Sequence, residues 1–205
     1  MIFKFYKNIL YTVIFICFFL TTSQSESTIN RIEIIVNDNV ITNYDIIQRV
    51  KITAILRRIN IDNDNYNLLT NSVIDELVEE HLKKDKVKEY DIEFTRDEFK
   101  NHEKRFIENF NYEKEELNEI FSINNISYRD FNDLLEIDLK WQKLIIGLYL
   151  RVTSATESEV ETILNSNSNL TKEQAKDIIL QKQIDIKSDK LLKDMKSEST
   201  IEYKN

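Results

Sequence analysis

Glycine, proline and cysteine are nearly missing from this chain of 205 residues, which contains one glycine, no proline and one cysteine. Glycine-rich loops that bind nucleotide phosphates need several closely spaced glycines, so the sequence excludes them. The glycine-framed turn that exposes the nucleophile of many serine hydrolases is disfavoured for the same reason. We therefore expect no nucleotide, no other cofactor and no catalytic residue.

Histidine is also scarce, since the chain has only His81 and His102. Neither has a second histidine or a cysteine three or four residues away, which is the spacing from which helical metal sites are built. We expect no metal site. His102 lies on the same predicted helical face as Phe99 and Phe106, and this position predicts a partly buried histidine with a structural role.

Positive charge is in deficit, with 28 lysine and arginine residues against 36 aspartate and glutamate residues and a formal net charge of −8. A surface of this sign repels phosphate backbones, so we expect no nucleic-acid partner. Carboxylate clusters such as the one at residues 75–80 are typical of a solvated helix face. A hydrophobic share of 41% with 31% charged residues excludes a disordered chain and a polytopic membrane protein.

One long apolar run is present, at the start of the chain. Lys4 and Lys7 precede residues 9–20, and the small polar residues 21–25 follow, which is the order of regions in a secretory signal. A membrane-spanning helix needs about 20 apolar residues. We therefore favour cleavage near Ser23 or Ser25 over an uncleaved anchor, and we expect the protein to be periplasmic.

Export would change the composition of the chain. Without Lys4 and Lys7 it keeps 26 basic and 36 acidic residues, a formal charge of −10. Cys17 would leave with the first segment, so the exported part would have neither a disulfide nor a thiolate metal site. The stability of that part must then come from its apolar core.

Local patterns after residue 30 predict a β-hairpin followed by helices. Residues 31–36 are rich in β-branched side chains, the turn-prone residues 37–39 follow, and residues 40–41 resume the apolar pattern. Residues 200–203 have the composition of an edge strand. Helices are predicted where a serine or threonine precedes an acidic residue or a glutamine by three positions. These starts are Thr42, Thr95, Ser127, Thr156 and Thr171, with further helices expected from residue 68 and over residues 114–121.

The helix that follows Ser127 is predicted to be central, because its apolar residues cover more than one stripe of its surface. Asp138 lies among them, between Leu134 and Trp141. An ionised side chain in such a seam needs a partner or water. We expect Asp138 to form a buried ion pair with a lysine or an arginine.

Residues 34–46, with the sequence IIVNDNVITNYDI, resemble the opening of the SurA family of periplasmic chaperones. The similarity extends more loosely to residue 152, and residues 95–98 (TRDE) match the family's way of starting a helix. Residues 175–203 are similar to the long helix and strand that close the family's fold. The resemblance implies a mainly α chaperone core, in which a small hairpin near the N-terminus pairs with a C-terminal edge strand.

The chain departs from the family in one respect. SurA-type proteins usually carry one or two parvulin-type prolyl isomerase domains before the closing helix. Here that interval, residues 154–170, has 17 residues, whereas an independently folding domain takes at least about 50. We therefore expect no isomerase activity. The predicted layout is a signal over residues 1–25, a helical module over 26–153, a linker over 154–170, and a closing helix and strand over 171–205 that pack on the module.

The resemblance implies an ATP-independent holdase that binds unfolded envelope or outer-membrane proteins. A chaperone that works without nucleotide binds its clients through exposed apolar surface, and aromatic side chains supply the most contact area. We expect two or three aromatic residues of the middle module to line the client groove, and the sequence does not choose among them. The candidates are Phe106, Phe110, Tyr112, Phe121, Tyr128, Trp141 and Tyr149.

An alternative from a different functional class stays open. The chain could be an export-linked structural or adaptor module that binds one specific folded partner. It would contact a membrane only through its first segment, if that segment is not cleaved. A holdase binds many unfolded chains, whereas an adaptor binds one partner stoichiometrically, so the range of bound proteins separates the two functions.

Overall fold

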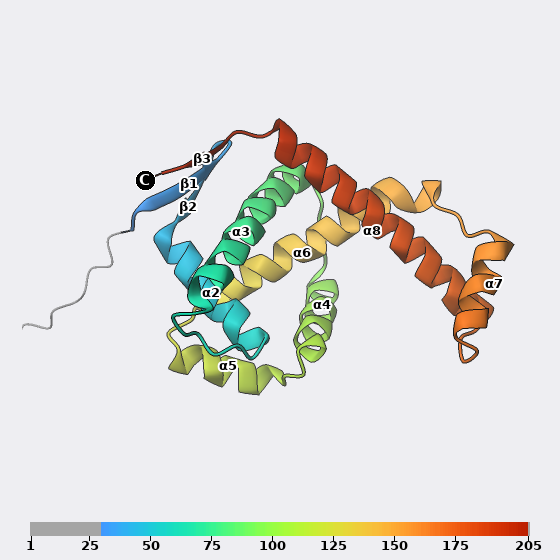
Figure 1. Cartoon of the computed structure of the whole chain (residues 1–205), viewed down its shortest axis with the longest axis horizontal. Coiled ribbons are helices and arrows are strands. Elements are labelled where there is room, and N and C mark those ends of the chain that lie inside the picture. The colour runs from blue at the N-terminus through green and yellow to red at the C-terminus, as the bar shows by residue number, and fades with distance from the viewer. Residues whose placement is uncertain (1–29, 205) are drawn as a thin grey trace, which may run out of the picture.

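The structure is a computed structural model that describes residues 30–204 (Figure 1). The predicted export signal, residues 1–25, lies outside these residues. The described part is mainly helical, as predicted, with seven α-helices and one three-stranded sheet. In chain order the elements are β1 (Ile32–Val36), β2 (Asn39–Thr42), α2 (Asn43–Leu56), α3 (Tyr66–Glu89), α4 (Arg96–Asn109), α5 (Lys114–Ile123), α6 (Tyr128–Tyr149), the 3₁₀ turn η1 (Leu150–Val152), α7 (Glu157–Ser166), α8 (Lys172–Glu198) and β3 (Ile201–Tyr203).

The sheet joins the two ends of the described chain. β1 lies between β2 and β3 and pairs with both in antiparallel register, with Ile34 opposite Ile41 and Val36 opposite Ile201. The hairpin turn places Asn37 at φ 52°, a left-handed conformation that asparagine tolerates where glycine is missing. The predicted hairpin and the predicted pairing of a C-terminal edge strand with it are both confirmed.

Four of the helices begin with a side-chain cap at the residue where the sequence predicts the helix start. Thr42, Thr95, Thr156 and Thr171 each form a capping box with the residue three positions later. The fifth start is different. α6 begins after Ser127 as predicted, but the Ser127 side chain makes no capping hydrogen bond. The prediction of the helix start is confirmed and the implied side-chain cap is wrong.

Among residues 30–204, apolar side chains gather in four clusters. The first joins the inner face of the sheet to α2 and α3, and the second joins the end of α2 to α4, α5 and α6. The third lies where α3, α6 and α8 meet, around Trp141, and the fourth joins α7 to the first half of α8. α6 contributes to the second and third clusters, which fits its predicted central position.

The long helix α8 links the sheet to α7. Figure 1 shows α8 running from α7, past α6 and α3, to the start of β3. The interval 154–170, predicted as a linker, contains α7, whose Val160 packs on Ala175 and Ile179 of α8. Among the helices of residues 30–204, none combines the length and the apolar composition that a membrane-spanning segment requires.

Candidate functional site

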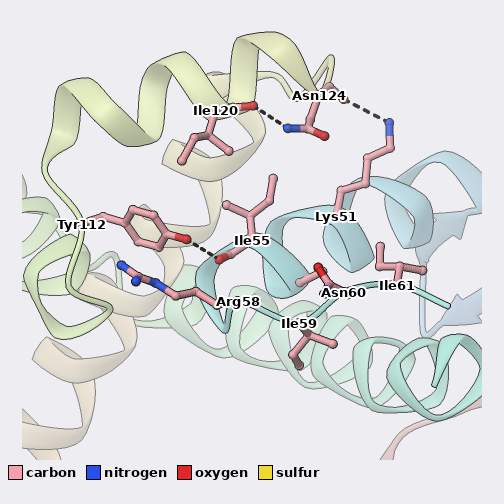
Figure 2. Close-up of a pocket in the computed structure, with 10 residues that line it drawn as sticks. Lys51, Ile55, Arg58, Ile59, Asn60, Ile61, Tyr112, Ile120 and Asn124 are labelled. Carbon is pink, nitrogen blue, oxygen red and sulfur yellow. Dashed lines mark hydrogen bonds between the residues drawn. The ribbon is translucent and has the colours of Figure 1, made fainter.

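A crevice lies between the end of α2, the loop after it, and α5. Its volume is about 400 Å³ and it is open to solvent (Figure 2). Aliphatic side chains and one aromatic ring form most of its lining, and no carboxylate is among the lining residues. These residues are Lys51, Ala54, Ile55, Arg58, Ile59, Asn60, Ile61, Tyr112, Ile120 and Asn124. We call this site the α2–α5 crevice.

The way α2 ends creates one wall of the crevice. The Ile59 amide donates to the Ala54 carbonyl at 2.8 Å, and the Arg58 amide donates to the Ile55 carbonyl at 3.1 Å. These two bonds, with Arg58 at φ 55°, form a Schellman motif. The motif turns the chain sharply, and Ile59 packs against the first apolar cluster, which contains Ala54, while both Ile59 and Ile61 form part of the crevice lining.

Arg58 is unusual at this position. Five non-glycine residues of the described chain have positive φ, and the other four, Asn37, Asp91, Asn111 and Asn125, are asparagine or aspartate. A left-handed conformation costs a residue with a long side chain roughly 1 kcal/mol. The turn is therefore built with a residue that its backbone does not favour.

Asn and Asp side chains hold the loop that follows. The Asp62 carboxylate accepts hydrogen bonds from the amides of Asp64 (3.0 Å) and Asn65 (2.9 Å). The Asn65 side chain donates to the Asn60 carbonyl at 2.7 Å. The loop that carries Ile59 and Ile61 is thus fixed by its own hydrogen bonds.

Tyr112 connects the opposite wall to α2. Its hydroxyl donates to the Ile55 carbonyl at 2.8 Å, and the Arg58 guanidinium carbon lies 4.7 Å from the centre of its ring. The ring also packs in the second apolar cluster. Tyr112 therefore fixes the position of the Arg58 side chain at the border of the crevice.

Two cations lie at opposite borders of the α2–α5 crevice. The Lys51 ammonium donates to the Asn124 carbonyl at 3.2 Å, and the Arg58 guanidinium donates to the Asn111 carbonyl at 2.9 Å. Figure 2 shows Ile55 between them. Within residues 30–204, neither cation has a carboxylate at ion-pair distance.

A second, more polar pocket of about 230 Å³ lies where α2, α3 and α6 meet. Arg49 and Glu80 form an ion pair there. Burial lowers the pKa of His81. Burial, and then the charge of Asp133, raise the pKa of Asp130. The buried Gln48 Oε1, His81 Nδ1 and Asp130 Oδ2 atoms have no hydrogen-bond partner in the described part of the chain.

The seven predicted groove residues do not form one groove. Phe106, Phe110, Tyr112, Phe121 and Tyr128 belong to the second apolar cluster, whereas Trp141 and Tyr149 belong to the third. The candidate set is therefore divided between two clusters, because α4, α5 and α6 turn their aromatic faces toward one another.

Three of the seven aromatic residues are core residues. Phe121 is 1% exposed and contacts the rings of Phe131 and Tyr128 at centroid distances of 5.3 and 6.1 Å. Trp141 is buried, and its indole donates to Ser188 at 3.1 Å. Tyr112 is also buried, although it lines the α2–α5 crevice.

The other four aromatic residues are half-buried. Tyr128 donates to the Glu103 carboxylate at 2.8 Å, and burial together with that carboxylate raises its pKa. Phe106 lines a shallow pocket of about 200 Å³ between α3, α4 and α6. Phe110 packs beside Phe106 with a ring-centroid distance of 5.3 Å. Tyr149 lies at the end of α6, with the Lys187 ammonium 5.7 Å from its ring centre.

The structure corrects the expectation for Asp138. Its partner is His102, not a lysine or arginine, with 3.1 Å between the imidazole Nε2 and the carboxylate Oδ2. Gln142 also donates to Asp138 at 2.9 Å, and the Asp138 side chain is 36% exposed. Because water reaches this carboxylate, it does not need a permanent cation. His102 is 4% exposed and packs against Phe106, consistent with the structural role predicted for it.

No known protein family is identified by comparison. No protein-family model matches the chain, and no curated protein matches its sequence. Among the described residues, no group of three or more His, Cys, Asp or Glu side chains could hold a metal ion. The functional assignment therefore depends on the geometry of the molecule and on the resemblance of its residues.

Most residues of the α2–α5 crevice were not predicted as site residues. Tyr112 is the one member of the predicted aromatic set that lines it. The remaining lining is a mixture of aliphatic and polar side chains that come from α2, from the loop between α2 and α3, and from the second half of α5 and the residue after it. The sequence offers one usable indication there, since Ile59 and Ile61 are apolar residues within an otherwise polar, Asn- and Asp-rich connection.

Proposed function

We propose that this protein is an ATP-independent chaperone of SurA type that holds unfolded polypeptide segments in the α2–α5 crevice. The observation that carries the proposal is the crevice itself, an open site of about 400 Å³ with an apolar floor. Unfolded segments present aliphatic and aromatic side chains to solvent, and an open apolar site accepts them without requiring one sequence. A rigid polar pocket would not have this tolerance.

The size of the crevice suits weak and reversible binding. Burial of apolar surface contributes about 25 cal/mol per Å², so a client segment that buries a few hundred Å² gains several kcal/mol. Ordering the segment opposes part of this gain. The net affinity is then low enough for release without nucleotide hydrolysis.

The path of the chain supports the same proposal. β3 pairs with β1, and α8 packs along α3 and α6, so the closing helix and strand complete the helical module. This is the arrangement that the SurA resemblance implies. The interval between residues 154 and 170 contains α7 and has no room for an isomerase domain of at least about 50 residues. We accordingly propose binding without prolyl isomerisation.

The cellular setting is part of the proposal. The order of regions in residues 1–25 favours export to the periplasm, where ATP is not available to drive release. The clients proposed are unfolded envelope proteins, outer-membrane proteins among them, in transit through that compartment.

An aggregation assay tests the proposal. Residues 26–205, which include all described residues, are mixed without nucleotide with an unfolded β-barrel protein, and light scattering is followed. We expect aggregation to slow at equimolar protein and to slow further at several-fold excess. No effect at several-fold excess would contradict the proposal.

A matched pair of variants locates the activity. Ile61 is 45% exposed in the crevice, and Ile178 is 43% exposed on α8 outside it. Ile61→Ser removes about 1 kcal/mol of client contact, so we expect about fivefold weaker binding. Ile178→Ser makes the same change to an equally exposed side chain and is expected to leave binding unchanged. Equal effects of the two variants would place the binding site elsewhere.

A second candidate function is favoured by one specific observation. Large apolar side chains are exposed on η1 and on α8, and a folded partner would cover them. They are Leu150, Val152, Ile178 and Ile186. An adaptor using this surface would recover a single stoichiometric protein from an envelope extract, and Ile178→Ser would abolish that recovery. A holdase would recover many unfolded chains, and Ile178→Ser would leave them bound.

A further inference from the structure

We infer that the α2–α5 crevice selects client segments in which a carboxylate lies beside aliphatic side chains. The inference rests on the proposed function and specifies the class of segment bound. It is carried by the placement of Lys51 and Arg58 on the two borders of an apolar floor (Figure 2).

The crevice has the opposite charge from the molecule that contains it. The chain has a formal net charge of −8, yet two cations and no anion line this crevice. Three other pockets differ in this respect. The pocket at α2, α3 and α6 includes Asp45 and Glu80, the one beside Phe106 includes Glu79, and the one between α6 and α8 includes Asp185.

Both cations keep donors free for a ligand. Arg58 has five N–H donors, of which one bonds the Asn111 carbonyl. Lys51 has three, of which one bonds the Asn124 carbonyl. Neither has an ion-pair partner within residues 30–204. A carboxylate entering the crevice would therefore gain a cation without breaking an existing ion pair.

The position of Arg58 is fixed in advance. The contact with the Tyr112 ring and the bond to the Asn111 carbonyl hold the guanidinium at the border of the crevice. A planar guanidinium held in this way suits bidentate binding of a carboxylate. The unfavourable left-handed backbone of Arg58, where four comparable positions use Asn or Asp, fits a residue retained for its side chain.

The occupant we infer is an extended acidic and aliphatic segment. Aliphatic side chains of the client would cover Ile55, Ile59 and Ile61 on the floor, and a Glu or Asp of the client would reach Arg58 or Lys51. A basic segment would meet two like charges at the same borders. The sign of the client charge therefore changes affinity while the apolar contact stays the same.

Three labelled peptides test this inference by fluorescence anisotropy with the purified protein. They share one aliphatic sequence and differ only in two positions, which are Glu, Gln or Lys. We expect the Glu peptide to bind about fivefold more tightly than the Gln peptide at low salt, because exposed ion pairs are individually weak. The Lys peptide should bind most weakly. The preference for Glu should shrink in about 0.5 M salt, where the Debye length is only a few Å.

Variants assign the preference to the two cations. Asparagine tolerates the left-handed backbone at residue 58, so Arg58→Asn removes the charge while keeping the turn. Arg58→Asn and Lys51→Gln are each expected to reduce the Glu-to-Gln ratio, and the double variant to bring it close to one. Arg105→Gln removes an exposed cation of α4 that has no ion pair with any described residue and does not line the crevice, and it should leave the ratio unchanged.

The outcomes separate this inference from the proposed function. Equal binding of the Glu and Gln peptides to the unmodified protein would overturn the inference and leave the holdase proposal standing. A preference that survives the double variant would overturn it as well. Failure of all three peptides to bind would count against the proposed function. The salt series uses only the unmodified protein, so it decides the inference even if a variant fails to fold.

Discussion

Side chains of α5 divide between those buried in the core and those exposed to solvent. Phe121 lies at the centre of the second apolar cluster, between the rings of Tyr128 and Phe131. Ile123, two residues later on the same helix, is 72% exposed. Two apolar residues of one helix with opposite burial allow a direct test of whether Phe121 belongs to the core.

We predict that Phe121→Ala lowers the free energy of unfolding by about 3–5 kcal/mol, because it leaves a cavity among close-packed rings. Ile123→Ala should change it by less than about 0.5 kcal/mol. Urea denaturation followed by circular dichroism measures both values. Similar values for the two variants would contradict the assignment of Phe121 to the core.

His81 links the stability of the molecule to pH. Burial lowers its pKa in the folded protein, while the unfolded chain titrates near the ordinary value of 6.5. Below about pH 6.5 the unfolded chain therefore binds more protons than the folded protein at this residue. Protonation then favours unfolding, and stability should fall as the pH drops from 6.5 toward 5.

The variant His81→Asn isolates this contribution. We predict that the unmodified protein loses stability between pH 6.5 and 5 relative to His81→Asn, because the variant has no group to protonate at that position. Hydrogen bonds with Lys143 and Thr95 lower the pKa of Glu98 to about 2. Glu98 therefore changes the pH dependence of stability only below about pH 4.5, outside the range of this test. Thermal unfolding across this pH range measures the difference. Parallel melting curves for the two proteins would contradict the prediction.

Helix starts show what local sequence determines and what it does not. The Thr95 side chain accepts from the Glu98 amide at 3.2 Å and the Glu98 carboxylate accepts from the Thr95 amide at 2.7 Å. Such boxes depend on four consecutive residues, so the sequence predicts them well. At Ser127 the same pattern gives no side-chain cap. The Asp130 carboxylate lies near Tyr44 on α2 instead, a contact that no local pattern reports.

The two helix starts give a matched prediction. Thr95→Ala removes a side-chain cap and should lower the free energy of unfolding by about 1 kcal/mol. Ser127→Ala removes a hydroxyl that makes no capping bond and should have little effect. Denaturant titration compares them. A cost at residue 127 equal to that at residue 95 would show that Ser127 caps α6 in solution.

The aromatic groove could not be predicted residue by residue, because burial is decided by how helices pack. The apolar pattern of the sequence predicts the helices that contain the aromatic residues, and packing of α4, α5 and α6 brings five of the seven into one cluster. Which face of each ring stays accessible depends on neighbours distant in sequence. The α2–α5 crevice likewise depends on a left-handed Arg58, a conformation that an arginine in a sequence does not suggest.

At the scale of the whole molecule, the two ends of the described chain form one scaffold. β3 completes the sheet beside β1, the Lys204 amide donates to the Glu33 carbonyl at 2.7 Å, and Lys196 of α8 pairs with Asp75 of α3. α7 packs at the start of α8, which is the end of that helix farther from the sheet (Figure 1). The helical module is therefore completed by the end of the chain, as the sequence predicts, and the α2–α5 crevice lies within that completed module.

The most direct test of client binding in the crevice is methyl NMR of protein labelled at isoleucine, titrated with an unfolded client peptide. Four isoleucines line the site, Ile55, Ile59, Ile61 and Ile120, and others, such as Ile146 and Ile184, report on the groove between α6 and α8. Binding in the crevice predicts shifts concentrated on the first four. Shifts confined to Ile146 and Ile184, or none at saturating peptide, would contradict it.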